Sequence, residues 1–225
     1  MTEPTPSLRH LPRGRHGLPR EQVVASQRER ILSAMADAMV DYGYIGTSVA
    51  AILKRAGVSR ETFYEQFRSK EHCFEATYER AVTLLLDKIE RAAATVDDPE
   101  TVDEWTMRSN RMDRIFEAYL DHLVDDPASA RVFLVEVFAV GSPAVARRAE
   151  LQRLFVELIA EVLDVQTDAQ MFACAALAAG IGGMVTGRIA AGDMSGVRAL
   201  RAPLLDLVHR GGVLYGNAFA EPARR

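Results

Sequence analysis

The segment AGVSRETFYEQF, residues 56–67, has the pattern of a tight turn followed by a short helix. Gly57 suits the turn, because glycine tolerates the positive φ that lets two helices cross steeply. Ser59 is placed to cap the helix that follows. Phe63 and Phe67 are four residues apart and therefore share one side of that helix, which we expect to be buried. The polar residues between them must face elsewhere.

Two helices are expected before this one. From about residue 21 to residue 42, apolar positions fall on one helical stripe, and Gly43 follows as a C-terminal stop. Thr47 is expected to cap a short second helix that ends at the turn. Three helices in this order, with the last two joined at a glycine, are typical of a helix-turn-helix. That motif places its last helix in the major groove of DNA.

The exposed residues of this unit are suited to contact DNA. We expect Arg60 to donate two hydrogen bonds to a guanine and Glu61 to accept one from a cytosine. Hydroxyl and ammonium groups near helix N-termini suit phosphate contacts, which fix register more than sequence. The candidates for this role are Thr47, Ser59, Thr62, Tyr64 and Lys70, and we add Lys54 as a further DNA contact.

The charge distribution favours a polyanionic partner for the N-terminal part of the chain. The net charge is -4, yet residues 1–70 hold 11 Lys and Arg against 7 Asp and Glu, while the remainder holds 16 against 24. Residues 1–20 lack an apolar period and are expected to form a flexible basic arm. Within it, Arg13 and Arg15 are candidate minor-groove contacts, although a solvated tail explains them equally well.

The rest of the chain also has the pattern of helices, and no convincing strand occurs. A long helix capped by Ser69 is expected to reach about residue 96, and breaks that contain proline follow at 126–127 and 141–143. Pro203 suits the first turn of a last helix that runs to about residue 218. Helices are also expected around residues 105–123, 133–138, 151–162 and 167–191, which makes an all-α fold of about nine helices.

The stretch TSVAAILKRAGVSRETFYEQFRSKE, residues 47–71, resembles the N-terminal signature of the TetR family of bacterial transcriptional repressors. Its Ala-Gly-Val-Ser, Thr-x-Tyr and Phe-x-x-Lys-Glu elements are all present, and the likeness covers roughly residues 26–75. The resemblance implies a homodimer whose C-terminal domain binds an effector and whose last two helices form a four-helix dimer interface. It also implies that effector binding lowers operator affinity. We therefore expect the arm at 1–20, an N-terminal three-helix DNA-binding domain at 21–68 and an effector-binding and dimerisation domain at 69–225.

Two sets of residues are candidates for these last roles. Seven aromatic residues could line an effector cavity, although aromatics at helical spacing are commonly core. Phe133 and Phe155 are two of the seven. The five that we favour as ligand contacts are Trp105, Phe116, Tyr119, Phe138 and Phe172. Glycines inside a helix cost about 1 kcal/mol each relative to alanine, so close helix approach should compensate. A dimer interface fits this glycine cluster, and its expected members are Gly180, Gly183, Gly187 and Leu207.

Other classes of protein are disfavoured. The two cysteines, Cys73 and Cys174, are far apart, the five histidines are dispersed, and no nucleophile, base and acid occur in a recognisable order. We therefore expect no enzyme, no metal and no cofactor. Cys73 is either a redox-active thiol near a helix N-terminus or a buried inert one. The apolar run 171–186 is 16 residues long, shorter than the roughly 20 that span a bilayer, and no secretion signal is recognised. We expect a cytoplasmic protein without membrane contact.

The sequence as a whole predicts a ligand-responsive transcriptional regulator. We expect a repressor that binds a palindromic double-stranded DNA operator as a homodimer and is released by a small-molecule effector. Two alternatives stay open: a sequence-tolerant architectural DNA-binding protein, and a helical ligand-binding module without regulatory DNA binding. A discrete protected palindrome in a footprint would exclude the first, and DNA affinity at low salt would exclude the second.

Overall fold

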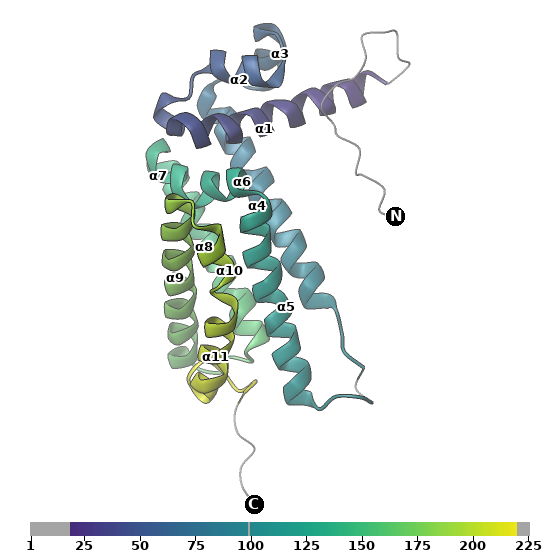
Figure 1. Cartoon of the computed structure of the whole chain (residues 1–225), viewed down its shortest axis with the longest axis vertical. Coiled ribbons are helices and arrows are strands. Elements are labelled where there is room, and N and C mark those ends of the chain that lie inside the picture. The colour runs from purple at the N-terminus through teal and green to yellow at the C-terminus, as the bar shows by residue number, and fades with distance from the viewer. Residues whose placement is uncertain (1–18, 99, 220–225) are drawn as a thin grey trace, which may run out of the picture.

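The computed structural model of the chain describes residues 19–98 and 100–219, and all regular elements within these ranges are helical. The expected all-α fold is therefore confirmed. Figure 1 shows three N-terminal helices stacked across one end of a set of roughly parallel helices. The N-terminal helices are α1 (Arg20–Gly46), α2 (Val49–Ala56) and α3 (Arg60–Gln66).

Helix α1 starts and breaks close to where its sequence predicts. It begins at Arg20, so the last residue of the expected arm already belongs to the helix. The break falls at Gly43, whose φ of 66° and ψ of 170° are not helical, and one further turn runs on to Gly46. Glycine tolerates this positive φ, which a larger residue adopts only with strain. The next free backbone N–H, that of Tyr44, points toward the second domain.

The caps of the helix-turn-helix follow the sequence with one exception. Ser59 caps α3 as expected, since its hydroxyl accepts from the N–H of Thr62 at 3.0 Å. Gly57 has the expected left-handed conformation, with a φ of 63°. The cap of α2 is Ser48 and not Thr47, because the hydroxyl of Thr47 is buried and donates to the carbonyl of Gly43 at 2.7 Å. Thr47 thus closes the break in α1 instead of starting α2.

The second domain consists of the remaining helices, of which the longer ones run along the long axis of the molecule (Figure 1). Their bounds are α4 (Lys70–Ala94), α5 (Glu104–Asp125), α6 (Pro127–Arg131), η1 (Val132–Glu136), α7 (Val137–Val140), α8 (Ser142–Val162), α9 (Asp168–Ala191), α10 (Met194–Arg198), α11 (Arg201–Gly211) and η2 (Gly212–Leu214). With α6, η1 and α7 taken as one rod and α10 and α11 as another, the described residues hold the nine helices expected.

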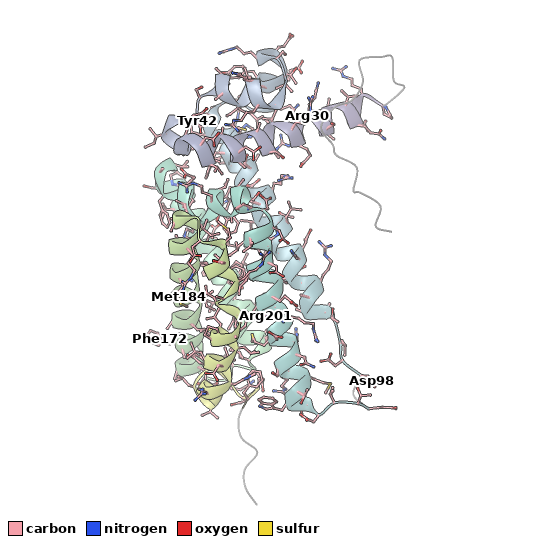
Figure 2. The ribbon with its side chains drawn as sticks, in the orientation of Figure 1. Arg30, Tyr42, Asp98, Phe172, Met184 and Arg201 are labelled. Carbon is pink, nitrogen blue, oxygen red and sulfur yellow. The ribbon has the colours of Figure 1, made fainter. Side chains whose placement is uncertain are left out.

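Three details of the second domain differ from expectation. The rod around residues 133–138 contains a π-helical turn, η1, which the periodicity did not reveal. Pro143, assigned to a break, lies in the first turn of α8, where its missing N–H costs nothing. The last helix begins at Arg201 and ends at Gly211, short of residue 218. It is held to α5 by Arg201, labelled in Figure 2, which donates to both carboxylate oxygens of Asp113 at 2.7 Å.

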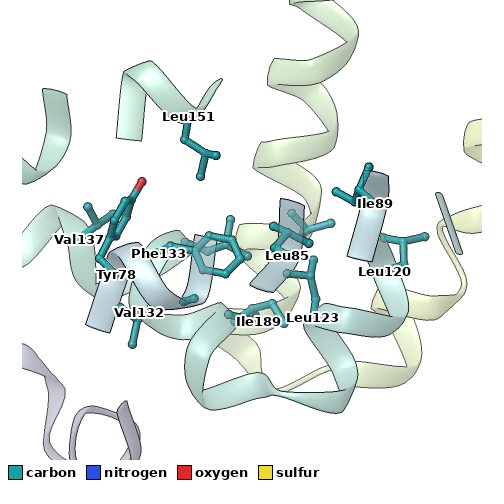
Figure 3. Close-up of a cluster of buried hydrophobic side chains, with 14 of the residues drawn as sticks. Tyr78, Leu85, Ile89, Leu120, Leu123, Val132, Phe133, Val137, Leu151 and Ile189 are labelled. Atoms are coloured by element: carbon teal, nitrogen blue, oxygen red, sulfur yellow. The ribbon is translucent and has the colours of Figure 1, made fainter. Parts of the chain in front are cut away.

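The core of the second domain lies where α4, α5, η1 and α9 meet. Figure 3 shows Phe133 of η1 beside Leu85 of α4, with Leu123 and Ile189 close by. Leu85 is 0% exposed and Phe133 is 1% exposed. Because packed cores respond to the loss of even a few methylene groups, this cluster should resist large-to-small substitution poorly. It also places η1 at the centre of the domain, in contact with α1, α4 and α9.

Substitution of Leu85 by alanine should destabilise the protein much more than the same change at its neighbour. Leu85 is fully buried and Leu84 is 39% exposed, on the same turn of α4. We expect Leu85→Ala to lower the free energy of unfolding by about 2–5 kcal/mol. Leu84→Ala should cost less than half as much in the same urea titration. Equal losses for the two variants would contradict this packing.

Candidate functional site

Helix α3 presents a polar edge on the outside of the N-terminal domain. Phe63 and Phe67 are both 0% exposed and lie 5.5 Å apart between ring centres. Arg60, Glu61 and Tyr64 are exposed on the opposite side. The division of the helix into buried rings and exposed polar groups is therefore the one that the sequence predicts. An edge of this kind can reach base edges in a major groove.

The candidate phosphate contacts are less uniform. Lys54 and Ser59 are exposed, although the hydroxyls of Ser59 and Thr62 lie 2.9 Å apart and serve the cap of α3. Thr47 is only 1% exposed, so its hydroxyl does not face solvent, and the interpretation of this side chain as a phosphate contact is wrong. Lys70 is engaged with Tyr44 in the interior of the domain junction. Arg13 and Arg15 lie outside the described residues.

Arginines of α1 hold the helix-turn-helix together. The guanidinium of Arg30, labelled in Figure 2, donates to the carbonyl of Ala56 at 3.1 Å and thus satisfies the C-terminal end of α2. The guanidinium of Arg28 lies 4.6 Å from the ring centre of Phe67. Part of the positive charge of the N-terminal domain is therefore structural. The aim of α3 depends on these contacts from α1.

A buried hydrogen bond joins the N-terminal domain to η1. The N–H of Tyr44, freed by the break at Gly43, donates to a carboxylate oxygen of Glu136 at 2.7 Å. The other oxygen of Glu136 accepts from Arg131 at 2.9 Å. Glu136 is 5% exposed, so its charge is balanced by Arg131 within a largely buried site. Buried charges need such a partner, because an unpaired one is strongly unfavourable.

Three further contacts fix Tyr44 in the same junction. The ammonium of Lys70 donates to its carbonyl at 3.0 Å, and its own hydroxyl donates to Glu71 at 3.2 Å. Its ring meets that of Phe74 edge to face, with 5.3 Å between centres. Burial, followed by the nearby charge of Glu71, raises the pKa of Tyr44 to about 12. Sequence reasoning missed this residue, because its partner Glu136 is 92 positions away along the chain.

An apolar cavity lies inside the second domain between α4, α5, η1, α8 and α9. The volume open to the centres of water molecules is about 60 Å³, room for about five waters at roughly 10–15 Å³ each. Its walls are mostly apolar. The lining residues are Ile89, Ile115, Phe116, Tyr119, Phe133, Leu134, Arg148, Leu151, Gln152, Phe155, Leu158, Ile159, Ala178, Ile181 and Gly182. A cavity of this small volume must widen before it takes a long apolar molecule.

The cavity has few polar groups, and one carries a charge. Arg148 donates to the carbonyl of Phe133 at 2.9 Å and stacks over the ring of Phe138 at 5.0 Å. Within the described residues, Arg148 makes no ion pair with a carboxylate. Gln152 and Tyr119 also line the cavity, and burial raises the pKa of Tyr119 above its usual value. An apolar chain with an anionic head suits such a lining.

Two of the five favoured ligand contacts, Phe116 and Tyr119, lie on the cavity wall. The other three do not, and their assignment to the cavity is wrong. Trp105 stacks on His209 with 4.9 Å between ring centres, near one end of the bundle. Phe138 is 56% exposed and Phe172 is 77% exposed. Among the described residues, sequence reasoning missed the polar members Arg148 and Gln152, since a lone Arg or Gln on a helix resembles any surface residue.

The outer face of α9 is apolar and uncovered in the single chain. Gly180, Gly183 and Gly187 have open space where a side chain would begin, and Leu207 of α11 is 44% exposed. Figure 2 shows Phe172 and Met184 pointing away from the bundle. By length and composition α9 could cross a membrane, and 33% of its most apolar window is buried. Core helices meet the same criterion, so this is weak evidence for a span. The run 171–186 is thus only partly buried within the chain.

Neither the thiols nor the described acidic and histidine residues form a chemical site. Burial raises the pKa of Cys73 to about 12, which keeps the thiol protonated and argues against a redox role. The hydroxyl of Thr77 and the charge of Arg28 offset this shift only in part. Within residues 19–98 and 100–219, no three His, Cys, Asp or Glu side chains gather in a way that could hold a metal ion.

Comparison with known proteins agrees with this geometry. The model of the family described as "Bacterial regulatory proteins, tetR family" matches residues 31–77, which span the helix-turn-helix. A curated relative, the HTH-type transcriptional activator FasR of Mycolicibacterium smegmatis, is 28% identical over 134 residues. The match covers 60% of this chain and 55% of FasR, so the chain spans about half the length of that relative.

Solved structures share the fold of the described chain. A TetR-like transcriptional regulator from Rhodococcus sp. RHA1 is 23% identical with a TM-score of 0.59, over 87% of this chain and 100% of that one. The regulator FadR from Bacillus subtilis, solved in complex with stearoyl-CoA, is 16% identical with a TM-score of 0.66, over 80% and 96%. Residues 31–77 therefore match the DNA-binding domain of the TetR family of bacterial transcriptional regulators, and the described chain shares the fold of TetR-like regulators.

Proposed function

We propose that the protein is a ligand-responsive transcriptional repressor that binds a palindromic operator as a homodimer and is released by an amphipathic small molecule. The observation that carries this proposal is a continuous chain of contacts from the DNA-binding helix to the cavity. The exposed edge of α3 belongs to a domain whose α1 is bonded, through Tyr44 and Glu136, to η1, and η1 lines an apolar cavity. A molecule that widens the cavity must therefore strain the junction. Repression takes place in the cytoplasm, where the operator is found.

The DNA-binding half of the proposal rests on α3. Arg60 and Glu61 lie in its first turn and Tyr64 lies one turn further, on the exposed side. In a two-fold dimer, two such helices enter successive major grooves about 34 Å apart. The operator is then an inverted repeat, because the protein and the DNA share the same symmetry axis. Arg13 and Arg15 remain proposed minor-groove contacts that add to this affinity.

The dimer half rests on the outer face of α9 and on α11. Glycines without neighbours at Gly180, Gly183 and Gly187 allow another helix to approach closely, and Met184 and Leu207 supply apolar area beside them. A monomer would leave this apolar face in water, which is unfavourable. Packing of the same face from a second chain removes it from solvent. We therefore place the two-fold axis beside α9 and α11.

The effector half rests on the cavity lining. The walls are apolar, and Arg148 is a charged group without a carboxylate partner in the described chain. This combination suits a molecule with a hydrocarbon chain and an anionic or oxygen-rich head, such as a fatty acyl compound. The stearoyl-CoA bound to FadR from Bacillus subtilis, which shares the fold, makes stearoyl-CoA a reasonable first probe.

The direction of control follows from operator position. A dimer that covers an operator inside a promoter excludes polymerase, and we favour this repressing arrangement. FasR of Mycolicibacterium smegmatis is named an activator, so a promoter-fusion assay with and without the protein decides between the two. The architectural alternative is disfavoured by the exposed Arg60 and Glu61, which are suited to read bases. If the protein only bound a ligand, the exposed polar edge of α3 would have no function.

Replacement of Arg60 or Tyr64 by alanine should weaken operator binding. Each loses a contact worth about 1–3 kcal/mol, which is a fall of roughly 5- to 150-fold in affinity. Fluorescence anisotropy on the duplex flanking the protein's own gene measures this. Arg198→Ala, which removes another exposed arginine, from α10, is the control and should bind as the wild type does. The DNA interface is misplaced if all three variants bind alike.

Replacement of Gly183 by phenylalanine should shift the protein toward monomer. A large side chain on the outer face of α9 prevents close approach of the second chain. Sedimentation velocity should show a monomer for Gly183→Phe and a dimer for Ala94→Phe, an exposed position at the end of α4. DNA affinity should fall with dimerisation. A Gly183→Phe protein that sediments as the wild-type dimer places the interface elsewhere.

Replacement of Ala178 by phenylalanine should block the cavity. Ala178 is 6% exposed and lines the cavity, whereas Ala149 on α8 is exposed. Isothermal titration with stearoyl-CoA should detect binding to the wild type and to Ala149→Phe, with at least a tenfold weaker interaction for Ala178→Phe. If stearoyl-CoA binds all three proteins with one affinity, it binds outside this cavity. If it binds none of them, the acyl class of effector is wrong.

A further inference from the structure

One five-residue turn belongs both to the cavity wall and to the domain junction. Phe133 and Leu134 of η1 (Val132–Glu136) line the cavity. Glu136, at the end of the same turn, accepts from the N–H of Tyr44. Helix α4 also lines the cavity and bonds the N-terminal domain through side chains, but the residues that make those bonds lie at least nine positions before its lining residue Ile89. The turn is therefore the shortest physical connection between cavity and DNA-binding domain.

The conformation of η1 is unusual in a way that bears on this connection. It is a π-helix, in which the N–H of Val137 donates to the carbonyl of Val132, five residues back. In an α-helix that N–H would donate to the carbonyl of Phe133, four residues back. Here the guanidinium of Arg148 donates to the Phe133 carbonyl instead, at 2.9 Å. A residue of the cavity wall thus stabilises the π form of the turn.

We propose that η1 is a two-state switch that Arg148 holds in its π form and that an anionic ligand head releases. The inference rests on the proposed function and specifies how its cavity acts on the DNA-binding domain. A carboxylate or phosphate in the cavity draws Arg148 away from the carbonyl of Phe133. That carbonyl then accepts from the N–H of Val137, and the turn becomes α-helical. π-Helical turns are rare and occur frequently at functional sites.

The change of form acts on Tyr44 through Glu136. Passing from a five-residue to a four-residue spacing turns Glu136 relative to Phe133, so its carboxylate moves off the N–H of Tyr44. A buried N–H without an acceptor is unfavourable. The end of α1 must therefore shift to find a new partner, and α3 shifts with it because Arg30 ties α1 to the end of α2. An apolar chain that widens the small cavity pushes Phe133 in addition.

Two variants should convert η1 from its π form to its α-helical form without any ligand. Arg148→Ala removes the donor to Phe133, and deletion of Val135 removes the additional residue that only the π form accommodates. In both, we expect hydrogen exchange of the peptide that contains Tyr44 to be about tenfold faster. DNA affinity should be about tenfold weaker, within the roughly 5- to 150-fold range of allosteric couplings. Mass spectrometry measures the first quantity and fluorescence anisotropy the second.

The controls match each change. Arg147→Ala removes a neighbouring arginine that pairs with Glu79 outside the cavity, and Val135→Ala keeps the length of the turn. Both should exchange and bind DNA as the wild type does. Wild-type exchange at Tyr44 in Arg148→Ala overturns the inference, and this variant decides alone if the deletion does not fold. A wild-type protein that binds no operator would contradict the proposed function. The switch can still be tested in that case, because the hydrogen-exchange measurement needs neither DNA nor ligand.

Discussion

The arrangement of the two domains depends on the hydrogen bond from the N–H of Tyr44 to the carboxylate of Glu136. The donor is free because Gly43, at a φ of 66°, interrupts α1 one residue earlier. The acceptor, Glu136, is 5% exposed, and its negative charge is paired with the guanidinium of Arg131. Leaving a buried N–H unpaired costs about 1–3 kcal/mol, a large part of the roughly 5–15 kcal/mol that stabilises a domain. A contact of this size can fix the DNA-binding domain firmly and still be overcome by a bound ligand.

Helix α9 brings together the other two requirements of a regulator. Its inner face, with Ala178 and Ile181, closes the cavity, while its outer face carries Gly183 and Met184 in open space. A ligand that widens the cavity pushes on the same helix that we expect to meet its partner chain. The spacing of the two α3 helices in a dimer therefore depends on both faces of α9. In the proposed dimer, a single change in cavity volume would therefore move both the junction and the interface.

Features that depend on neighbouring residues could be predicted from the sequence. Ser59 and Ser69 cap the helices that they were expected to cap, because a cap is made within three residues. The glycine turn and the buried rings of α3 followed for the same reason. The α2 cap was wrong by one position, since Thr47 and Ser48 have equivalent hydroxyls. Only the break at Gly43 gives the first of them another acceptor.

Features that depend on distant residues could not be predicted. Phe138 and Phe172 have the same helical spacing as Phe116, and spacing does not reveal which side of a bundle helix meets the cavity. The π-turn depends on Arg148, which lies on another helix, and Glu136 is recognised only through a partner 92 positions away. The chemistry of the site was accordingly predicted for the DNA edge, which is local. It was predicted only in part for the cavity.

The distance between the two α3 helices of the dimer tests the central claim most directly. A spin label at Glu65→Cys on each chain reports this distance by pulsed electron resonance, because Cys73 and Cys174 are buried and should not take up the label. With operator DNA the distance should be near the spacing of successive major grooves, about 34 Å. Stearoyl-CoA should move it by several ångströms in the wild type. An unchanged distance with the probe bound would contradict the account.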